Sequence, residues 1–349
     1  MLTFIIFILM LGIIVAIHEL GHFSFAKLFG VYVYEYSIGM GKKLFSKKPE
    51  NSETEYSIRM VPIGGFVRLA GEEGEDGDKS VPLEKKLYKK GFIQRFLIFF
   101  MGPGFNFLLA FVTLFISALI YGAISTAPIV GSVPENYPAY AAGIQEGDII
   151  LEVSGSKIKT WDDILWIVQT SDGSELSFKV KDVSGNIREV KITPEKALSD
   201  NGSTSYVFGI GRTSDKEHGI IPSFKYAVSK TGSLFKIMIA TVKSLFTGGV
   251  SVNDLSGPVG IYNIVGEQSK GGLENLLYLL AYLSINVGVI NLIPFPAFDG
   301  GHILFLLIEK IMRKPVPEKV ESTITGIGFI LLILLMIYIT CHDVINLIH

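Results

Sequence analysis

The sequence is poor in cysteine and in charged residues, and each shortage excludes a class of protein. Its 349 residues include one cysteine, Cys341, so a single chain can form neither a disulfide nor a cysteine-based metal site. Charged residues make up 18 % of the chain, against about 25 % in soluble domains, and the mean hydropathy is positive. The formal net charge of −2 gives no sign of nucleic-acid binding. The composition therefore indicates a membrane protein.

The first apolar run lacks two features of a cleaved signal peptide. Residues 4–17 have no Lys- or Arg-rich start and no small-residue cleavage site, and the apolar pattern continues past His22 to Phe29. We interpret this run as a retained membrane span. Four stretches are long and apolar enough to cross about 30 Å of hydrocarbon: residues 3–28, 96–122, 275–308 and 324–346.

The segment between the first two spans, residues 30–95, is charged and contains two strand-like patterns. Residues 31–40 and 54–69 alternate between apolar and polar positions, the second broken by a Pro-Ile-Gly-Gly turn at residues 62–65. These patterns predict a β-hairpin layer lying against the membrane. Residues 72–78 are acidic and contain glycine, which favours a solvated linker.

A polar region separates the second and third spans. Residues 127–196 have short strand-like runs and frequent turns, including a predicted hairpin of residues 178–183 and 187–193 around Ser184-Gly185-Asn186. We expect a small α+β domain here, followed by a linker over residues 197–272. Within the linker, residues 222–247 predict an amphipathic helix with lysines on one face. A helix on the membrane surface and one packed in soluble surroundings both fit this pattern.

Orientation follows from the distribution of lysine and arginine, which accumulate in cytoplasmic loops. The loop of residues 30–95 and the short loop after the third span are both rich in these residues, so both are expected to be cytoplasmic. Residues 127–270 and both termini then lie outside. The basic residues are Lys42, Lys43, Lys47, Lys48, Lys85, Lys86, Lys89, Lys90 and Arg95 in the first loop, and Lys310, Arg313, Lys314 and Lys319 in the second.

The first span contains an H-E-x-x-H motif at residues 18–22. Histidines four residues apart lie on one face of a helix, so both imidazoles can reach one Zn²⁺. The intervening Glu19 is placed to accept a proton from water beside the metal. Three ionisable side chains inside a hydrophobic span are costly unless they have partners, which favours a functional site over satisfied core residues.

A catalytic zinc needs a third protein ligand. Asp299 is the one acidic residue that lies away from the ends of the later spans, and prolines and glycines interrupt the helical pattern around it. Irregular backbone at membrane depth is tolerated where it lines a cavity. His22 lies roughly 10 Å and Asp299 roughly 15 Å from the predicted inner ends of their spans, at 1.5 Å per residue. Both residues should therefore reach one metal in the cytoplasmic half of the membrane.

At this point the sequence resembles the site-2 protease family of bacterial membrane zinc proteases, of the RseP/RasP type. Three elements carry the resemblance: residues 18–22, the Gly-Pro-Gly-Phe-Asn element at residues 102–106, and residues 291–301. The order of span, β-loop, span, soluble domain, span and span also matches. The implied fold is a polytopic α-helical membrane protein with four transmembrane helices, a membrane-associated β-hairpin loop and an inserted PDZ-like α+β domain.

The resemblance implies one Zn²⁺ per chain on His18, His22 and Asp299, with Glu19 as the catalytic base. It also implies substrate-positioning roles for Asn291 and Asn106. For Asn106, an interhelical hydrogen bond is an equally good interpretation.

In the family, the loop matching Gly64, Gly65 and Phe66 is thought to pair with the substrate and unwind it. The resemblance also implies an enzyme that cleaves transmembrane segments of single-span proteins, such as anti-sigma factors or leftover signal peptides. It would reside in the bacterial plasma membrane, with its active site toward the cytoplasm.

Residues 129–133 and 138–155 resemble a PDZ domain, which would lie outside the cytoplasm. PDZ domains capture extended peptides, including C-termini, at a sheet edge. Capture and steric filtering of access to the site both stay open. For His302, both packing and metal ligation are open. Residues 256–260 resemble an element of the family to which we assign no physical role.

Two other classes of protein compete with the protease. A catalytically silent PDZ-bearing receptor would have a damaged ligand set, whereas all four site residues are present. A metal transporter would have polar residues along several spans, whereas here they gather at one depth.

Overall fold

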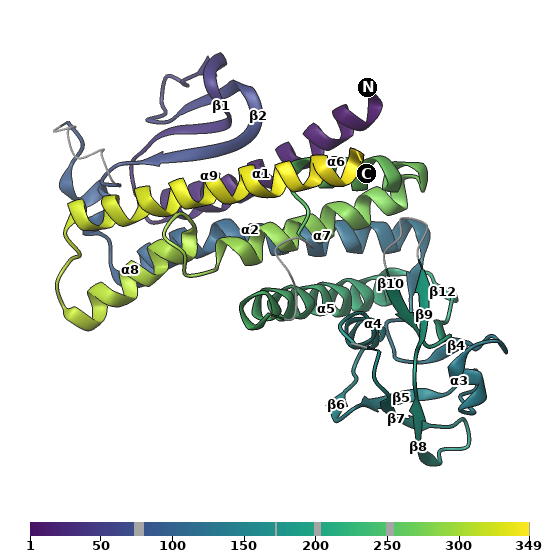
Figure 1. The fold of residues 1–349 in the computed structure, drawn as a ribbon. Coiled ribbons are helices and arrows are strands. Elements are labelled where there is room, and N and C mark those ends of the chain that lie inside the picture. The colour runs from purple at the N-terminus through teal and green to yellow at the C-terminus, as the bar shows by residue number, and fades with distance from the viewer. Residues whose placement is uncertain (73–79, 172, 199–203, 249–254, 349) are drawn as a thin grey trace. The chain divides into compact units, whose positions relative to one another are not determined.

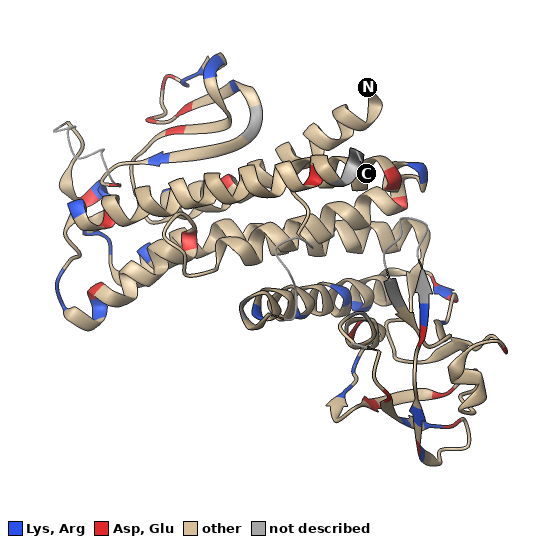
Figure 2. Cartoon of the chain, viewed as in Figure 1, with Lys and Arg blue, Asp and Glu red and all other residues tan. Residues whose placement is uncertain are grey.

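The computed structural model describes residues 1–72, 80–171, 173–198, 204–248 and 255–348. Among these residues, four helices are long and apolar enough to cross a membrane, as predicted. They are α1 (Leu2–Leu28), α2 (Phe92–Tyr121), α7 (Leu273–Asn291) and α9 (Glu318–Ile348) (Figure 1). Figure 2 shows that the middle of α7 and of α9 carries no charged side chain. The chain forms two compact units, one of Met1–Thr113 with Ser251–His349 and one of Leu114–Val250.

The third predicted span, residues 275–308, is two helices rather than one. Helix α7 ends at Asn291 after 19 residues, and a separate helix α8 (Asp299–Met312) begins beyond an irregular segment. Pro294 and Pro296 lie between them, and proline lacks the N–H that a continuous helix needs. The break therefore puts Asp299 at the start of a helix, with irregular backbone before it.

The predicted β-hairpin is present as β1 (Val33–Lys47) and β2 (Glu55–Leu69). Its register runs from Val33 opposite Leu69 to Lys47 opposite Tyr56. Residues 35–38 of β1 pair with residues 65–68 of β2 and also with residues 55–58 of β2. The hairpin is therefore folded, so that residues 35–38 lie between these two segments of β2. Residues 65–69 pair with β1 on one side, and among the described residues no strand pairs with their other edge.

Side-chain hydrogen bonds stabilise the hairpin internally and also connect it to α1. Within it, the buried carboxylate of Glu35 accepts hydrogen bonds from Ser57 Oγ at 2.5 Å and Arg59 Nη2 at 2.8 Å. Tyr36 donates a hydrogen bond from its hydroxyl to the carbonyl of Ala16 at 2.8 Å, two residues before His18. This contact holds the sheet beside the H-E-x-x-H motif.

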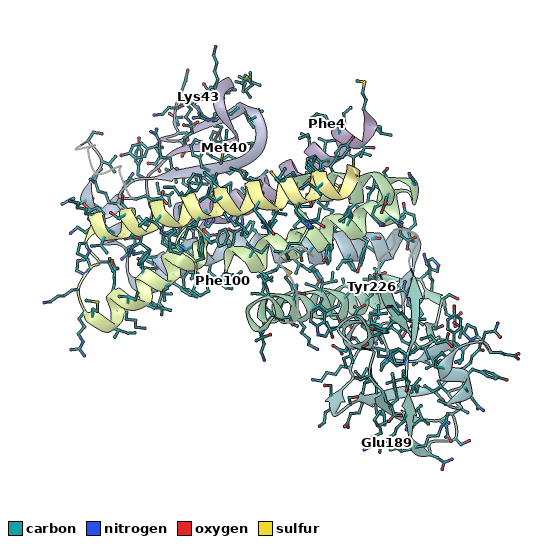
Figure 3. All side chains as sticks on the ribbon, viewed as in Figure 1. Phe4, Met40, Lys43, Phe100, Glu189 and Tyr226 are labelled. Carbon is teal, nitrogen blue, oxygen red and sulfur yellow. The ribbon has the colours of Figure 1, made fainter. Side chains whose placement is uncertain are left out.

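The hairpin presents exposed apolar side chains next to lysines, as expected of a β-layer at a membrane surface. Figure 3 marks Met40 and Lys43 on it. The exposed apolar residues are Met40, Leu44, Phe45, Ile58, Met60 and Val61.

Residues 256–260 contain the N-terminus of helix α6 (Pro258–Lys270), which we did not predict from the sequence. The N–H of Gly260 donates to Asp343 Oδ2 of α9 at 2.8 Å, and a Cβ at Gly257 would lie 2.8 Å from the same oxygen. A carboxylate at a helix N-terminus satisfies unpaired N–H groups. These residues therefore join α6 to α9.

The second unit contains the α+β domain that the sequence predicts to be PDZ-like. Its main sheet has the order β6-β5-β7-β8, and short strands pair β4 with β11, β3 with β12, and β9 with β10. Phe178, Ile150 and Ile144 are among the buried residues of its core. The elements are β3 (Ala123–Ile124), β4 (Val130–Ser132), α3 (Pro138–Ala141), β5 (Ile149–Val153), β6 (Ser156–Lys157), α4 (Trp161–Gln169), β7 (Leu176–Lys181), β8 (Ile187–Ile192), β9 (Glu195–Leu198), β10 (Thr204–Val207), β11 (Gly211–Arg212) and β12 (Lys216–Glu217).

The domain extends beyond the predicted boundary at residue 196, because β11 pairs with β4 and β12 pairs with β3. Strands of two residues carry no periodic signal in the sequence. The predicted amphipathic helix is present as α5 (Ile220–Thr247). Buried Lys230 of α5 binds both carboxylate oxygens of Asp162 at 2.7 and 2.8 Å, so one face of α5 packs on α4. The membrane-surface role of its exposed face stays a prediction.

Candidate metal centre

The three predicted ligands meet in the first unit. His18 and His22 lie on one face of α1, and Asp299 is the first residue of α8. The two Nε2 atoms are 3.2 Å apart, and Asp299 lies 3.2 Å from His18 Nε2 through Oδ2 and 3.4 Å from His22 Nε2 through Oδ1. Among the described residues, this is the group of His, Cys, Asp and Glu side chains arranged to hold a metal.

The arrangement fits zinc. Ligands held at about 2.05 Å in tetrahedral geometry lie about 3.3 Å from one another, close to the separation of the two Nε2 atoms and to the distance from each Nε2 atom to its nearer oxygen of Asp299. Both imidazoles are buried, and Asp299 Oδ2 is buried without a hydrogen-bond partner among the described residues. Three electron-pair donors facing one point in a buried site are suited to holding a cation between them.

The break before α8 explains how Asp299 reaches the histidines. Phe298 precedes the helix in an extended conformation, and the N–H groups of Phe295 and Phe298 bond to carbonyls within the break. A Cβ at Gly300 or Gly301 would collide with carbonyls of this same segment. The glycines therefore let the broken backbone pack tightly against the first turn of α8.

Each ligand histidine has a partner on α2 for its second ring nitrogen. His22 Nδ1 lies 2.8 Å from the carbonyl of Ile98, and His18 Nδ1 lies 3.2 Å from the side chain of Asn106. Such partners fix the tautomer and the ring orientation of a metal-bound histidine. Helix α2 thus holds the ligands that α1 supplies.

The two helices can make these contacts because glycines line their crossing. A Cβ at Gly21 would overlap the carbonyl of Met101, and a Cβ at Gly102 would overlap the His22 ring. Small residues of this kind let membrane helices approach closely.

We expect Gly102→Ala to displace the His22 ring and to lower both zinc content and activity. A shift of about 1 Å in a reacting group can cost on the order of 100-fold in rate. Gly104→Ala is the matched control, because a Cβ there meets only the movable sulfur of Met101 at 3.1 Å and Phe100 at 3.9 Å. Metal analysis of both purified variants is the measurement, and equal zinc content in the two would contradict the expectation.

Glu19 faces the outer strand of the folded hairpin. The Val67 N–H donates a hydrogen bond to its carboxylate, and a Cβ at Gly65 would lie 3.1 Å from its Cγ. A cavity of about 190 Å³ opens between these elements, lined by His18, Glu19, His22, Gly65, Phe66, Val67, Leu69, Glu72, Ile98, Phe99, Asp299 and His302. The candidate base, the metal ligands and the free strand edge therefore share one cavity.

The remaining predicted residues divide into those at the cavity and those away from it. Gly65 and Phe66 line it, and Gly64 has a positive φ of 87° where the hairpin bends. Asn291 donates to the carbonyl of Val287 in its own helix at 3.0 Å. Asn106 is fully buried and contacts His18, which favours the interhelical hydrogen bond that the sequence left open.

Two ionisable residues that line the cavity were not assigned to the site from the sequence. His302 stacks on Phe99 with ring centroids 4.9 Å apart, and its Nδ1 lies 3.5 Å from Glu321, so its position is that of a packed residue. Glu72, which we placed in a solvated linker, lines the cavity instead, and burial raises the pKa of its carboxyl. The acidic composition of residues 72–78 does not indicate that the side chain of Glu72 faces the cavity.

Comparisons with known proteins show the family of the chain. The model of peptidase family M50 matches residues 6–335. The regulator of sigma-W protease RasP of Bacillus subtilis is 31 % identical over 98 % of each chain, and a putative zinc metalloprotease of Clostridium perfringens is 37 % identical over 95 % of each. The solved PDZ domain of an SdrC-like protein from Listeria innocua covers 27 % of this chain and 99 % of its own, with 25 % identity and a TM-score of 0.22.

Two buried histidines and an aspartate arranged to hold a metal, with a glutamate between the histidines, are the residues that a membrane-embedded zinc metalloendopeptidase requires. The chain belongs to peptidase family M50, the site-2 proteases, and its four apolar helices make it a multi-pass membrane protein.

Proposed function

We propose that this enzyme cleaves the transmembrane segments of single-span membrane proteins inside the bilayer. The observation that carries the proposal is the position of the ligand set, within α1 and at the start of α8, where Glu19 faces the free edge of residues 65–69. We propose that the peptide bond to be cleaved lies beside residues 65–69, because Glu19 and the ligand set line the same cavity as this edge.

A transmembrane helix hides its peptide groups in internal hydrogen bonds, so it must unwind locally before cleavage. Among the described residues no strand pairs with the outer edge of residues 65–69, so an extended chain could add there, as in strand addition, at backbone groups other than the Val67 and Leu69 N–H groups, which donate to Glu19 and Glu72. We assign Gly65 and Phe66 to contact with that chain and Gly64 to the bend that exposes the edge. We assign Asn291, which ends α7 just before the break, to positioning the substrate.

The chemistry divides between the metal and Glu19. Zinc, when bound by His18, His22 and Asp299, supplies a Lewis acid that polarises a carbonyl and makes water more acidic. The Glu19 carboxylate accepts a proton from the attacking water and returns it to the amine nitrogen that leaves. The Val67 N–H holds this carboxylate toward the strand edge.

Anti-sigma factors and signal-peptide remnants are the substrate classes that we propose, since both end as single membrane spans. The name of the Bacillus subtilis relative ties that protein to a sigma factor. Photocrosslinking from the strand edge in an inactive Glu19→Gln background, inside native membranes, would identify the bound chains. Recovery of soluble proteins alone would contradict the proposal.

For the PDZ-like domain we propose capture of peptide C-termini. A cavity of about 380 Å³ lies between α4 and residues 206–211, with Trp161, Ile164 and Leu165 of the helix on one wall. A groove between a helix and a strand-like segment is the usual peptide site of such domains. Filtering of substrates by size remains the competing role, and it predicts no binding of isolated peptides to this groove.

We further propose that the hairpin faces the cytoplasm and the PDZ-like domain the exterior, from the distribution of basic residues. A reporter active only in the cytoplasm should be active when inserted after Asn51, in the hairpin turn, and inactive after Gly185, between β7 and β8. A periplasm-type reporter at the same two positions serves as the control and should give the reverse pattern. The opposite result would invert the proposed orientation.

A further inference from the structure

Asn106 of α2 occupies an unusual position for a polar residue. Its exposed fraction is 0 %, and its amide nitrogen lies 3.2 Å from His18 Nδ1. Its Oδ1 is buried and has no hydrogen-bond partner among the described residues. Its backbone carbonyl accepts a hydrogen bond from Ser284 Oγ of α7 at 2.9 Å, which fixes the position of the residue.

The imidazole of His18 decides which amide atom must face it. His18 Nε2 points at His22 and Asp299, so it carries the electron pair that a metal receives. A neutral imidazole that binds metal through Nε2 carries its proton on Nδ1 and is a donor there. An amide NH₂ group opposite this N–H would place two donors face to face.

Rotating the amide by 180° removes the conflict. The oxygen and nitrogen of an asparagine side chain have nearly the same shape, so their assignment follows from the hydrogen bonds that they make. In either orientation one amide atom lacks a partner among the described residues. The proton on His18 Nδ1 therefore determines the orientation, with Oδ1 toward the ring.

We propose that Asn106 is the positioning residue of His18: its Oδ1 accepts a hydrogen bond from the Nδ1–H, which fixes the tautomer and holds the ring toward the metal. The proposal rests on the ligand set described above. His22 has the equivalent partner in a backbone carbonyl, that of Ile98 at 2.8 Å, which no side-chain substitution removes. Substituting Asn106 thus tests a hydrogen-bond partner of a ligand without altering the ligand itself.

Outer partners of metal-bound histidines are worth about 10–100-fold in metal affinity. Asn106→Leu keeps the approximate volume and removes the acceptor, and Asn106→Asp keeps an acceptor in the same place and removes the donor. We expect the Leu variant to release zinc to a chelator at a concentration about 10–100-fold lower than wild type, and the Asp variant to retain zinc at least as well as wild type. Thr113→Val, also buried on α2, is the matched control and should behave as wild type.

The measurement is competition between the purified full-length protein and a chromophoric zinc chelator, together with the visible spectrum of the cobalt-substituted protein. Distorted ligation in the Leu variant should change that spectrum. A Leu variant that holds zinc as wild type does would overturn the proposal. So would an Asp variant that releases zinc like the Leu variant while matching wild type in metal-free thermal stability. If the Asp variant is less stable, Asn106→Thr, with a hydroxyl that can accept, should retain zinc better than Leu, and equal loss in both would count against the role.

Failure of this inference differs from failure of the ligand set. If His18→Phe keeps its zinc, His18 is not a ligand, and the proposed function and the role of Asn106 fall together. If His18→Phe loses zinc and Asn106→Leu does not, the ligand set stands and only the role of Asn106 falls.

Discussion

Glu19→Gln is expected to bind zinc and substrate as wild type does while its turnover falls by about 10²–10⁴-fold, the range that general base catalysis contributes. Glutamine has the same length as glutamate, so it fills the space beside Gly65 without new contacts, but its amide cannot accept a proton from water. The Val67 N–H can still donate to the amide oxygen. Geometry is therefore retained and only the proton acceptor is lost.

The measurement is cleavage of a purified single-span substrate in detergent or liposomes, with zinc content determined on the same samples. Glu72→Gln is the control, because Glu72 lines the same cavity at the end of the hairpin and we assign it no proton-transfer role. Turnover of Glu19→Gln within tenfold of wild type would show that another group is the base. Loss of zinc from this variant would show that Glu19 is needed for binding.

Asp299→Asn should remove most of the bound zinc and nearly all activity. The carboxylate contributes the negative charge that partly neutralises the cation in a site otherwise made of two neutral imidazoles. A neutral amide lowers affinity by more than the roughly 10–100-fold that outer-shell partners contribute. Asp299→Glu keeps the charge but moves it by one methylene group, so we expect it to retain metal with a reduced rate.

Asp343→Asn provides the matched control. Asp343 is also a buried carboxylate at a helix N-terminus, where it accepts the Gly260 N–H, but it lies on α9 away from the ligands. Its loss should lower stability through the α6–α9 contact and leave zinc content at one per chain. Retention of zinc by Asp299→Asn, measured by metal analysis after dialysis, would refute the ligand set.

The grouping of His18, His22 and Asp299 was predictable because it follows from local chemistry. Four-residue spacing places His18 and His22 on one helix face, and a carboxylate amid prolines in an apolar segment is too costly to bury without a partner such as a metal. The prolines also located the irregular segment. They did not show that the third span ends at Asn291, because apolar composition continues through α8.

What the sequence did not show depends on contacts between distant segments. The fold-back of the hairpin pairs residues 35–38 with 55–58 in addition to the ordinary hairpin register, and strand periodicity is the same with or without it. Helix α6 has one residue classed as buried, Val265, and its N-terminus depends on Asp343. The partner of Asn106 is set by the close crossing of α1 and α2 at Gly21 and Gly102.

The separation of the ligands along the chain has a consequence for biosynthesis. His18 and His22 precede Asp299 along the chain, with α2 and α7 between them, so they are synthesised well before it. A nascent chain that still lacks α8 has only two imidazoles for the metal, too few for a catalytic zinc site. The protease therefore lacks its complete ligand set while α1, α2 and α7 pass through the insertion machinery, and it can become active only after α8 has been made.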